Sequence, residues 1–288
     1  MSLGIAIKGS EGIVLAADSR VTLFNQVPAP QVPGAPAQVI VIPANFDNAT
    51  KVLTVAGQKR VAAVTYGLGS FITPSGPRTM HSFIPEFEKE LKSAGVDSDL
   101  PVEDFAKQLS AFFKNQWDTV IKRPPLNPAE EINFLVGGFD MDAAYGRVFM
   151  FQIPTHPDPT EQNAGPAQFG ITWGGQHDLV YRLLYGFDIE LPKFVQTSLT
   201  LSDAQFSPFS QGLHQRFSSG IPFQFLPLQD CIDLAVFLIK NTIEFQKYRT
   251  TTVRGVGGPV VVGTITRRAG FQWRINGPVV TEGDDHAS

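Results

Sequence analysis

The sequence predicts an α+β fold in which a pair of sheets lies between helical layers, and three observations lead to this prediction. Short apolar, β-branched runs separated by glycine-containing turns occur at both ends of the chain and in its middle. Helical stretches with apolar residues at three- and four-residue spacing separate these runs. No sequence period repeats and no linker divides the 288 residues, so we expect one domain spanning residues 1–280.

The first half of the chain begins with a predicted hairpin. Residues 4–8 and 13–17 are apolar runs that flank Gly-Ser-Glu-Gly, and two further strands are expected at 51–55 and 60–65. Closely spaced prolines at residues 26–48 predict a long irregular insertion on the surface. Two helices are expected next, because apolar side chains recur from Met80 to Leu91 and from Phe105 to Val120.

The second half of the chain repeats this alternation of strands and helices. Expected strands lie at residues 133–138, 147–152, 169–173, 260–266 and 270–275, and expected helices at 177–185 and 228–248. Residues 188–227 are rich in Phe, Ser, Gln and Pro without helical or strand periodicity, so we expect a second insertion there. The acidic tail at residues 281–288 is expected to be disordered.

Composition narrows the classes of partner and cofactor. A net charge of −4 without a block of Lys or Arg argues against nucleic acid and against an anionic membrane surface. A lone cysteine, Cys231, leaves no intrachain disulfide and no paired-cysteine zinc site, and no metal or cofactor motif is found. Neither a membrane span nor a signal peptide is recognisable, so we expect a cytoplasmic protein without a cofactor.

Ser2 is the candidate nucleophile. Initiator methionine is usually removed when a small residue follows, and Ser2 would then carry both a hydroxyl and a free α-amine. An α-amine with a pKa of about 8 can serve as the general base for the hydroxyl of the same residue. The first two residues therefore predict an N-terminal nucleophile.

Several motifs further along the chain resemble the proteasome β-subunit family of N-terminal nucleophile hydrolases. The run Ala-Ala-Asp-Ser-Arg at residues 16–20 follows the first hairpin at the family's spacing, with Ser2 at the position of the family's threonine. Lys51 resembles the family's strand-initiating lysine, and Gly67 the glycine whose amide contributes to the oxyanion hole. Residues 136–140 with 146–148 are similar to the family's central hairpin, and residues 257–258 to its late glycine pair.

The resemblance implies a four-layer αββα sandwich of two antiparallel sheets between helices, and an endopeptidase that forms an acyl-enzyme. The implied catalytic residues are Ser2, Asp18, Lys51 and Gly67, the implied substrate-binding residues are Val21, Ala49 and Leu53, and Arg20 has a structural role at the site. A buried ammonium at Lys51, held by Asp18, would lower the pKa of the Ser2 hydroxyl and amine. Implied partners are peptides or unfolded proteins, a homo-oligomeric ring and a regulatory cap.

The chain departs from the family at two positions around the amine. The family's serine in a Gly-Ser-Gly turn and its late aspartate correspond here to Gly174 and Val253, whose side chains neither donate nor accept hydrogen bonds. Thr251, Thr252 and Gln176 are candidate substitutes. Two alternatives therefore stand beside the peptidase: a non-catalytic ring subunit, and a small-molecule amidase whose pocket is formed by the two insertions.

Overall fold

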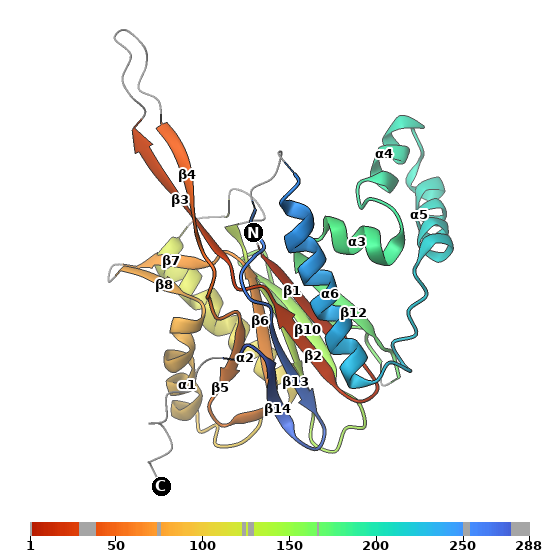
Figure 1. Cartoon of the computed structure of the whole chain (residues 1–288). Helices are drawn as coiled ribbons and strands as arrows, with labels where there is room; N and C mark the ends of the chain where they lie inside the picture. Colours follow the sequence, from red (N-terminus) through yellow and green to blue (C-terminus); the bar gives the residue numbers. More distant parts are fainter. Residues whose placement is uncertain are drawn as a thin grey trace.

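The computed structural model describes residues 2–28, 39–73, 76–122, 125, 130–165, 167–249 and 254–277. Its elements form a mixed α+β fold with antiparallel sheets, as the sequence predicts (Figure 1). Three of the sequence predictions, concerning the tail at 281–288, the pair Thr251 and Thr252, and Val253, lie outside the described residues.

The first sheet contains the N-terminal hairpin at its centre. Its strand order is β12-β1-β2-β13-β14, with bounds Gly170–Gly175, Leu3–Lys8, Ile13–Ala17, Val261–Thr266 and Gly270–Ile275. All neighbouring strands are antiparallel. Residues 9–12 join β1 to β2, so the first predicted hairpin is confirmed.

The second sheet is built from the middle of the chain. Its order is β11-β10-β9-β6-β5, with bounds His156–Gln162, Arg147–Ile153, Ile132–Gly138, Gln58–Gly67 and Val52–Val55. Strand β11 was not predicted, because the prolines at residues 157 and 159 interrupt its strand pattern. Only one side of β11 pairs within this sheet, and an edge strand can accommodate proline, which has no N–H to donate.

Helices pack against both sheets. Helices α1 (Ile84–Ser93) and α2 (Val102–Gln116) form an apolar cluster with the second sheet. A short 3₁₀ helix (His81–Phe83) precedes α1, and a π turn (Trp117–Ile121) follows α2. Helices α3 (Asp178–Tyr185) and α6 (Leu228–Gln246) form a second apolar cluster with the first sheet. A third apolar cluster joins the facing sides of the two sheets. In the described part of the chain, no helix has both the length and the apolar character needed to cross a membrane.

Strand β1 divides its side chains between two of these clusters. Leu3, Ile5 and Ile7 are buried against the helix α6 side, whereas Ala6 belongs to the cluster between the sheets. Since successive residues of a strand point to opposite faces, Ser2 and Gly4 share the face of Ala6. The candidate nucleophile therefore points toward the second sheet.

The expected irregular insertion at residues 26–48 was wrong for its described parts. Strands β3 (Val21–Pro28) and β4 (Val39–Phe46) pair along their whole lengths and form a ribbon that projects from the body of the molecule (Figure 1). Among the described residues each strand of this ribbon has one neighbour, so proline can occupy the open edge without losing a ladder hydrogen bond. A second unpredicted ribbon pairs β7 (Ser70–Thr73) with β8 (Gly76–Thr79).

The second expected insertion also contains regular structure. Helices α4 (Leu191–Ser198) and α5 (Asp203–Phe217) lie within residues 188–227 and stand beside α3 (Figure 1). Helix α5 buries none of its side chains, so its sequence has no apolar stripe to reveal it. The start of α5 could have been recognised from its capping pair, a serine followed three residues later by a glutamine. In the structure the Ser202 N–H donates to Gln205 Oε1 at 3.1 Å.

Candidate active site

The backbone of Ser2 is held tightly by the end of strand β12. Ser2 is 4% exposed, and its carbonyl accepts a hydrogen bond from the Gln176 N–H at 2.8 Å. Gly175 has a φ of +95°, and a Cβ at this position would lie 1.9 Å from the Ser2 carbonyl oxygen. Only glycine therefore allows β12 to approach the start of β1 this closely.

Asp18 joins the start of β1 to three other segments. Its Oδ1 accepts from the Leu3 N–H at 2.9 Å and from Lys51 Nζ at 2.7 Å, and its Oδ2 accepts from the N–H groups of Arg20 at 3.1 Å and Gly257 at 3.0 Å. The Asp18 side chain is fully buried. A carboxylate with this many donors stays where they hold it, and here it is bonded to the residue that follows Ser2.

Lys51 lies immediately before β5 and is 5% exposed. Burial lowers its pKa, and the adjacent Asp18 carboxylate opposes that change. The Lys51–Asp18 ion pair thus places a positive charge inside the protein, in a hollow that Ser2 also lines. A charge in this position favours the deprotonated forms of nearby hydroxyl and amine groups.

Gly67 is the last residue of strand β6. Its φ is +92°, and a Cβ there would lie 2.2 Å from the Glu131 carbonyl oxygen and 2.7 Å from Asn133 Nδ2. A side chain at position 67 would therefore collide with fixed backbone. Gly67 and Ser2 together line both hollows beside the nucleophile.

The two hollows differ in their linings. One, of about 440 Å³, extends from Ser2 and Tyr66 toward Trp173 and His177. The other is much smaller, about 20 Å³, and extends from Ser2 toward Val21 and Ala49, two of the three predicted substrate-binding residues.

Leu53 is not brought to either hollow. It is 1% exposed and packs in the cluster beneath helices α1 and α2, whereas its neighbour Val52 faces the first sheet. The alternation of strand β5 thus points Leu53 away from Ser2.

The Arg20 side chain connects neighbouring segments of the chain through hydrogen bonds. Its guanidinium forms two hydrogen bonds with Asp47, at 2.6 Å to Oδ1 and 2.8 Å to Oδ2, and a third with the Arg254 carbonyl at 3.2 Å. The Arg20 guanidinium lowers the pKa of the Asp47 carboxyl. A Cβ at Gly257 would lie 2.4 Å from Arg20 Cζ, so the absence of a side chain at 257 makes room for this arginine.

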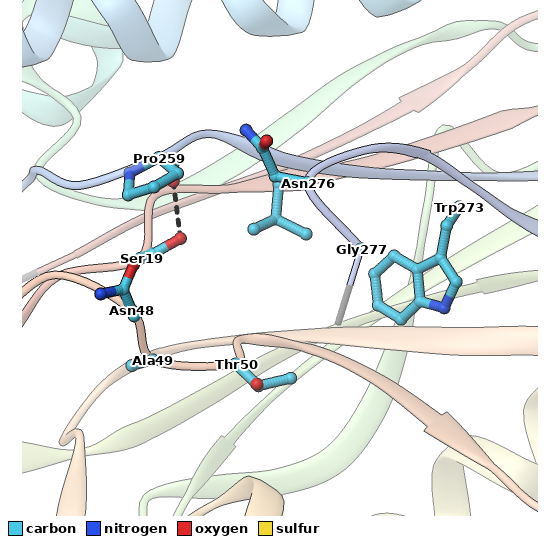
Figure 2. Close-up of a pocket in the computed structure, with 9 residues that line it drawn as sticks. Ser19, Asn48, Ala49, Thr50, Pro259, Trp273, Asn276 and Gly277 are labelled. Carbon is cyan, nitrogen blue, oxygen red and sulfur yellow. Dashed lines mark hydrogen bonds between the residues drawn. The ribbon is translucent and has the colours of Figure 1, made fainter. Parts of the chain in front are cut away.

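A third hollow of about 420 Å³ is lined in part by residues 48–50 (Figure 2). Ser19, Thr50, Trp273 and Asn276 are among its lining residues, and the Ser19 hydroxyl donates to the Pro259 carbonyl at 2.6 Å. None of the described residues that line it is ionisable. Within the described part of the chain, ionisable side chains therefore border the Ser2 hollows and not this one.

The structure places three further polar residues beside Ser2. The sequence assigned no role to Thr65 or Tyr66 and named Gln176 only as a candidate substitute. The side-chain oxygens Thr65 Oγ1 and Gln176 Oε1 are buried without a hydrogen-bond partner among the described residues, and both residues line a hollow beside Ser2. Tyr66, next to Gly67, is 5% exposed and lines both hollows. Side-chain environment alone reveals these groups, since Thr, Tyr and Gln have many roles in a sequence.

The described residues contain no group of three or more His, Cys, Asp or Glu side chains placed to hold a metal ion. Comparison of the chain with models of known protein families and with curated proteins found no match. The function is therefore argued from the site.

Proposed function

We propose that this protein is an N-terminal serine peptidase similar to proteasome β subunits, with a four-layer αββα sandwich, whose nucleophile is Ser2 after removal of Met1. One observation carries the proposal. The buried Lys51–Asp18 pair, with an Nζ to Oδ1 distance of 2.7 Å, is hydrogen-bonded to the backbone N–H of the residue after Ser2. Lys51 and Ser2 line the same hollow, which supports a role for this charge beside a serine that would carry its own amine base.

In the proposed reaction the Ser2 α-amine takes the proton of the Ser2 hydroxyl while Oγ attacks the carbonyl carbon of a peptide bond. The tetrahedral intermediate collapses to an ester on Ser2, and the leaving amine departs with the proton from the α-ammonium. Water then attacks the ester, again with the α-amine as base, and releases the acid product. Lys51 favours the deprotonated hydroxyl, and Asp18 keeps Lys51 charged and in position.

Gly67 is assigned to the oxyanion hole in this proposal. Where one donor of an oxyanion hole has been removed from an enzyme, the loss of transition-state stabilisation is about 2.7–4 kcal/mol. Val21 and Ala49 line the adjacent hollow, of about 20 Å³, with small, uncharged side chains. We expect peptides with a small apolar residue before the scissile bond to be the preferred substrates.

We further propose that copies of the chain assemble into a ring in the cytoplasm that takes unfolded proteins through a regulatory cap. Exposed apolar side chains on β4 support an assembly: Ile40, Ile42 and Phe46 are 45%, 48% and 59% exposed. Apolar groups gathered on a projecting ribbon are typical of contacts between proteins. The non-catalytic subunit remains the second candidate, favoured by Gly174, which offers no side chain to the Ser2 amine.

The proposal is tested by intact mass measurement and N-terminal sequencing, before and after treatment with a peptide epoxyketone. This electrophile forms a ring only with a hydroxyl and an amine of the same residue. We expect loss of Met1 and one adduct on Ser2, absent in Lys51→Ala and retained in Lys59→Ala, an exposed lysine. Circular dichroism shows whether each variant is folded. Retained Met1, or a free Ser2 that does not react, would contradict the proposal.

A further inference from the structure

The ring of Tyr66 occupies space left by two glycines that face each other. Gly4 of β1 and Gly174 of β12 are directly paired in the first sheet. A Cβ at Gly4 would lie 2.8 Å from Tyr66 Cδ1, and a Cβ at Gly174 would lie 2.2 Å from Tyr66 Oη. Neither position can carry a side chain while the tyrosine is present, and the phenol hydroxyl takes the place where the side chain of residue 174 would begin.

This hydroxyl lies on the same side of the first sheet as Ser2. Ser2 and Gly4 share one face of β1 by the alternation of the strand, and the Tyr66 ring packs against that face at Gly4. Ser2 and Tyr66 also line the same hollow of about 440 Å³. The tyrosine therefore reaches across from the second sheet to the strand that carries the nucleophile.

The Tyr66 hydroxyl makes no hydrogen bond to another residue that the structure describes, and the residue, only 5% exposed, lines the hollow that Ser2 also lines. The hydroxyl oxygen is not fully buried, so it is available to a polar group in that hollow. Burial raises the pKa of Tyr66, and the charge of Glu131 adds to this, so the group remains an uncharged O–H at physiological pH. It can both donate and accept one hydrogen bond.

We propose that Tyr66 is a positioning residue whose hydroxyl hydrogen-bonds to the α-amine of processed Ser2 and orients it as the base. This inference rests on the proposed function. The O–H donates to the neutral amine, and its oxygen accepts from the ammonium after proton transfer, so one contact serves both states. Gln176 lines the same hollow, and its Oε1, which is buried without a partner among the described residues, can accept from a second N–H of the amine.

The inference predicts the direction of a pH shift. Ionisable groups near the amine come from each neighbouring element: Lys51 before β5, Glu131 before β9 and His177 after β12 line the hollows, and Asp18 after β2 is bonded to Lys51 and to the Leu3 N–H. A hydrogen bond is stronger when one partner is charged, so the Tyr66 oxygen stabilises the ammonium more than the neutral amine. Removing it should lower the pKa of the amine.

The test measures the rate of Ser2 modification by the epoxyketone between pH 5 and pH 9 in the full-length protein. Tyr66→Phe retains the ring, and Tyr145→Phe, a partly exposed tyrosine outside both hollows, is the matched control. We expect Tyr66→Phe to lower the plateau rate about 10-fold and to move the acidic limb of the profile to lower pH. Tyr145→Phe should match the wild type.

A second pair of variants tests the position of the hydroxyl. Tyr66→Ala should lose most of the rate, and adding Gly174→Ser should restore part of it, because the serine hydroxyl can then occupy the vacated space. Gly174→Ser alone should be inactive, since its Cβ would collide with Oη.

The outcomes separate this inference from the proposed function. A reactive wild type with an unchanged Tyr66→Phe profile overturns the role of Tyr66 and leaves the peptidase standing. A wild type that keeps Met1 or never reacts overturns the peptidase, and the role of Tyr66 with it.

Discussion

The two ends of strand β1 each have a buried lysine beside them, and the two lysines are held in different ways. Near the Ser2 end, Lys51 is paired with the Asp18 carboxylate at 2.7 Å. At the other end, Lys8 is 1% exposed and donates to two backbone carbonyls, those of Asn163 at 3.0 Å and Gly165 at 2.9 Å. Burial lowers the pKa of both lysines, so burial alone does not identify a catalytic lysine. The carboxylate partner and the nearby serine distinguish Lys51.

Removing the carboxylate should have the largest effect. We expect Asp18→Asn to reduce the modification rate of Ser2 at least 100-fold and to destabilise the protein by about 3–5 kcal/mol, because Lys51 is left buried without its counterion. Epoxyketone labelling and urea unfolding measure the two quantities. An Asp18→Asn variant that labels at the wild-type rate would mean that the ion pair does not support Ser2.

Replacing each lysine by methionine compares the two ends directly. Lys51→Met should abolish labelling of Ser2, whereas Lys8→Met should label normally and lose about 1–3 kcal/mol, since two carbonyls lose their donor. Labelling is scored by intact mass and stability by urea unfolding. Equal labelling of the two variants would contradict the assignment of Lys51, and not Lys8, as the lysine that supports the reaction of Ser2.

The lowered pKa of Lys8 should be visible in the pH dependence of the free energy of unfolding. Its folded-state pKa lies below the ordinary value of 10.5, so the unfolded chain binds more protons between these two values. The Lys8 contribution therefore makes the wild type more stable as pH rises toward 10.5, relative to Lys8→Met. Urea unfolding of both proteins at pH 7, 8.5 and 9.5 checks the sign, and a difference that shrinks with pH would contradict it.

The smallest effect is expected at the partly exposed pair of Arg20 and Asp47. Their side chains are 19% and 43% exposed, so solvent weakens the attraction. We expect Asp47→Asn to cost less than about 1 kcal/mol and to leave the labelling of Ser2 unchanged. Thermal unfolding and intact mass provide the measurements. A large loss of labelling would show that Arg20 acts on the site through more than packing.

The strands and the helices with a buried stripe were predictable because burial leaves a periodic pattern in the sequence. Residues 13–17 and 270–275 were predicted with the bounds that the structure gives. Helix α5 and the β3–β4 ribbon were not, because an exposed helix has no stripe and prolines on an open edge look like a loop.

Some residues of the candidate site could likewise be predicted from the sequence, and others could not. Spacing along the chain predicted Asp18, Lys51 and Gly67, and the structure brings Asp18 and Lys51 into contact and places Gly67 in the hollows that Ser2 lines. Tyr66 had no assigned role, because the room for its ring depends on two glycines 170 positions apart in the sequence. Such complementarity between distant positions becomes visible only in three dimensions.

The hydrogen bond from the Gly257 N–H to Asp18 joins residues 239 positions apart. Ribosomes make the N-terminal end first, so Ser2 and Lys51 emerge long before Gly257 is synthesised. Until then Asp18 lacks one of its donors, and the segment that packs against Arg20 does not yet exist. Under the proposed function, the active site of a nascent chain would be incomplete. The chain would become able to cleave peptides only when translation is nearly complete.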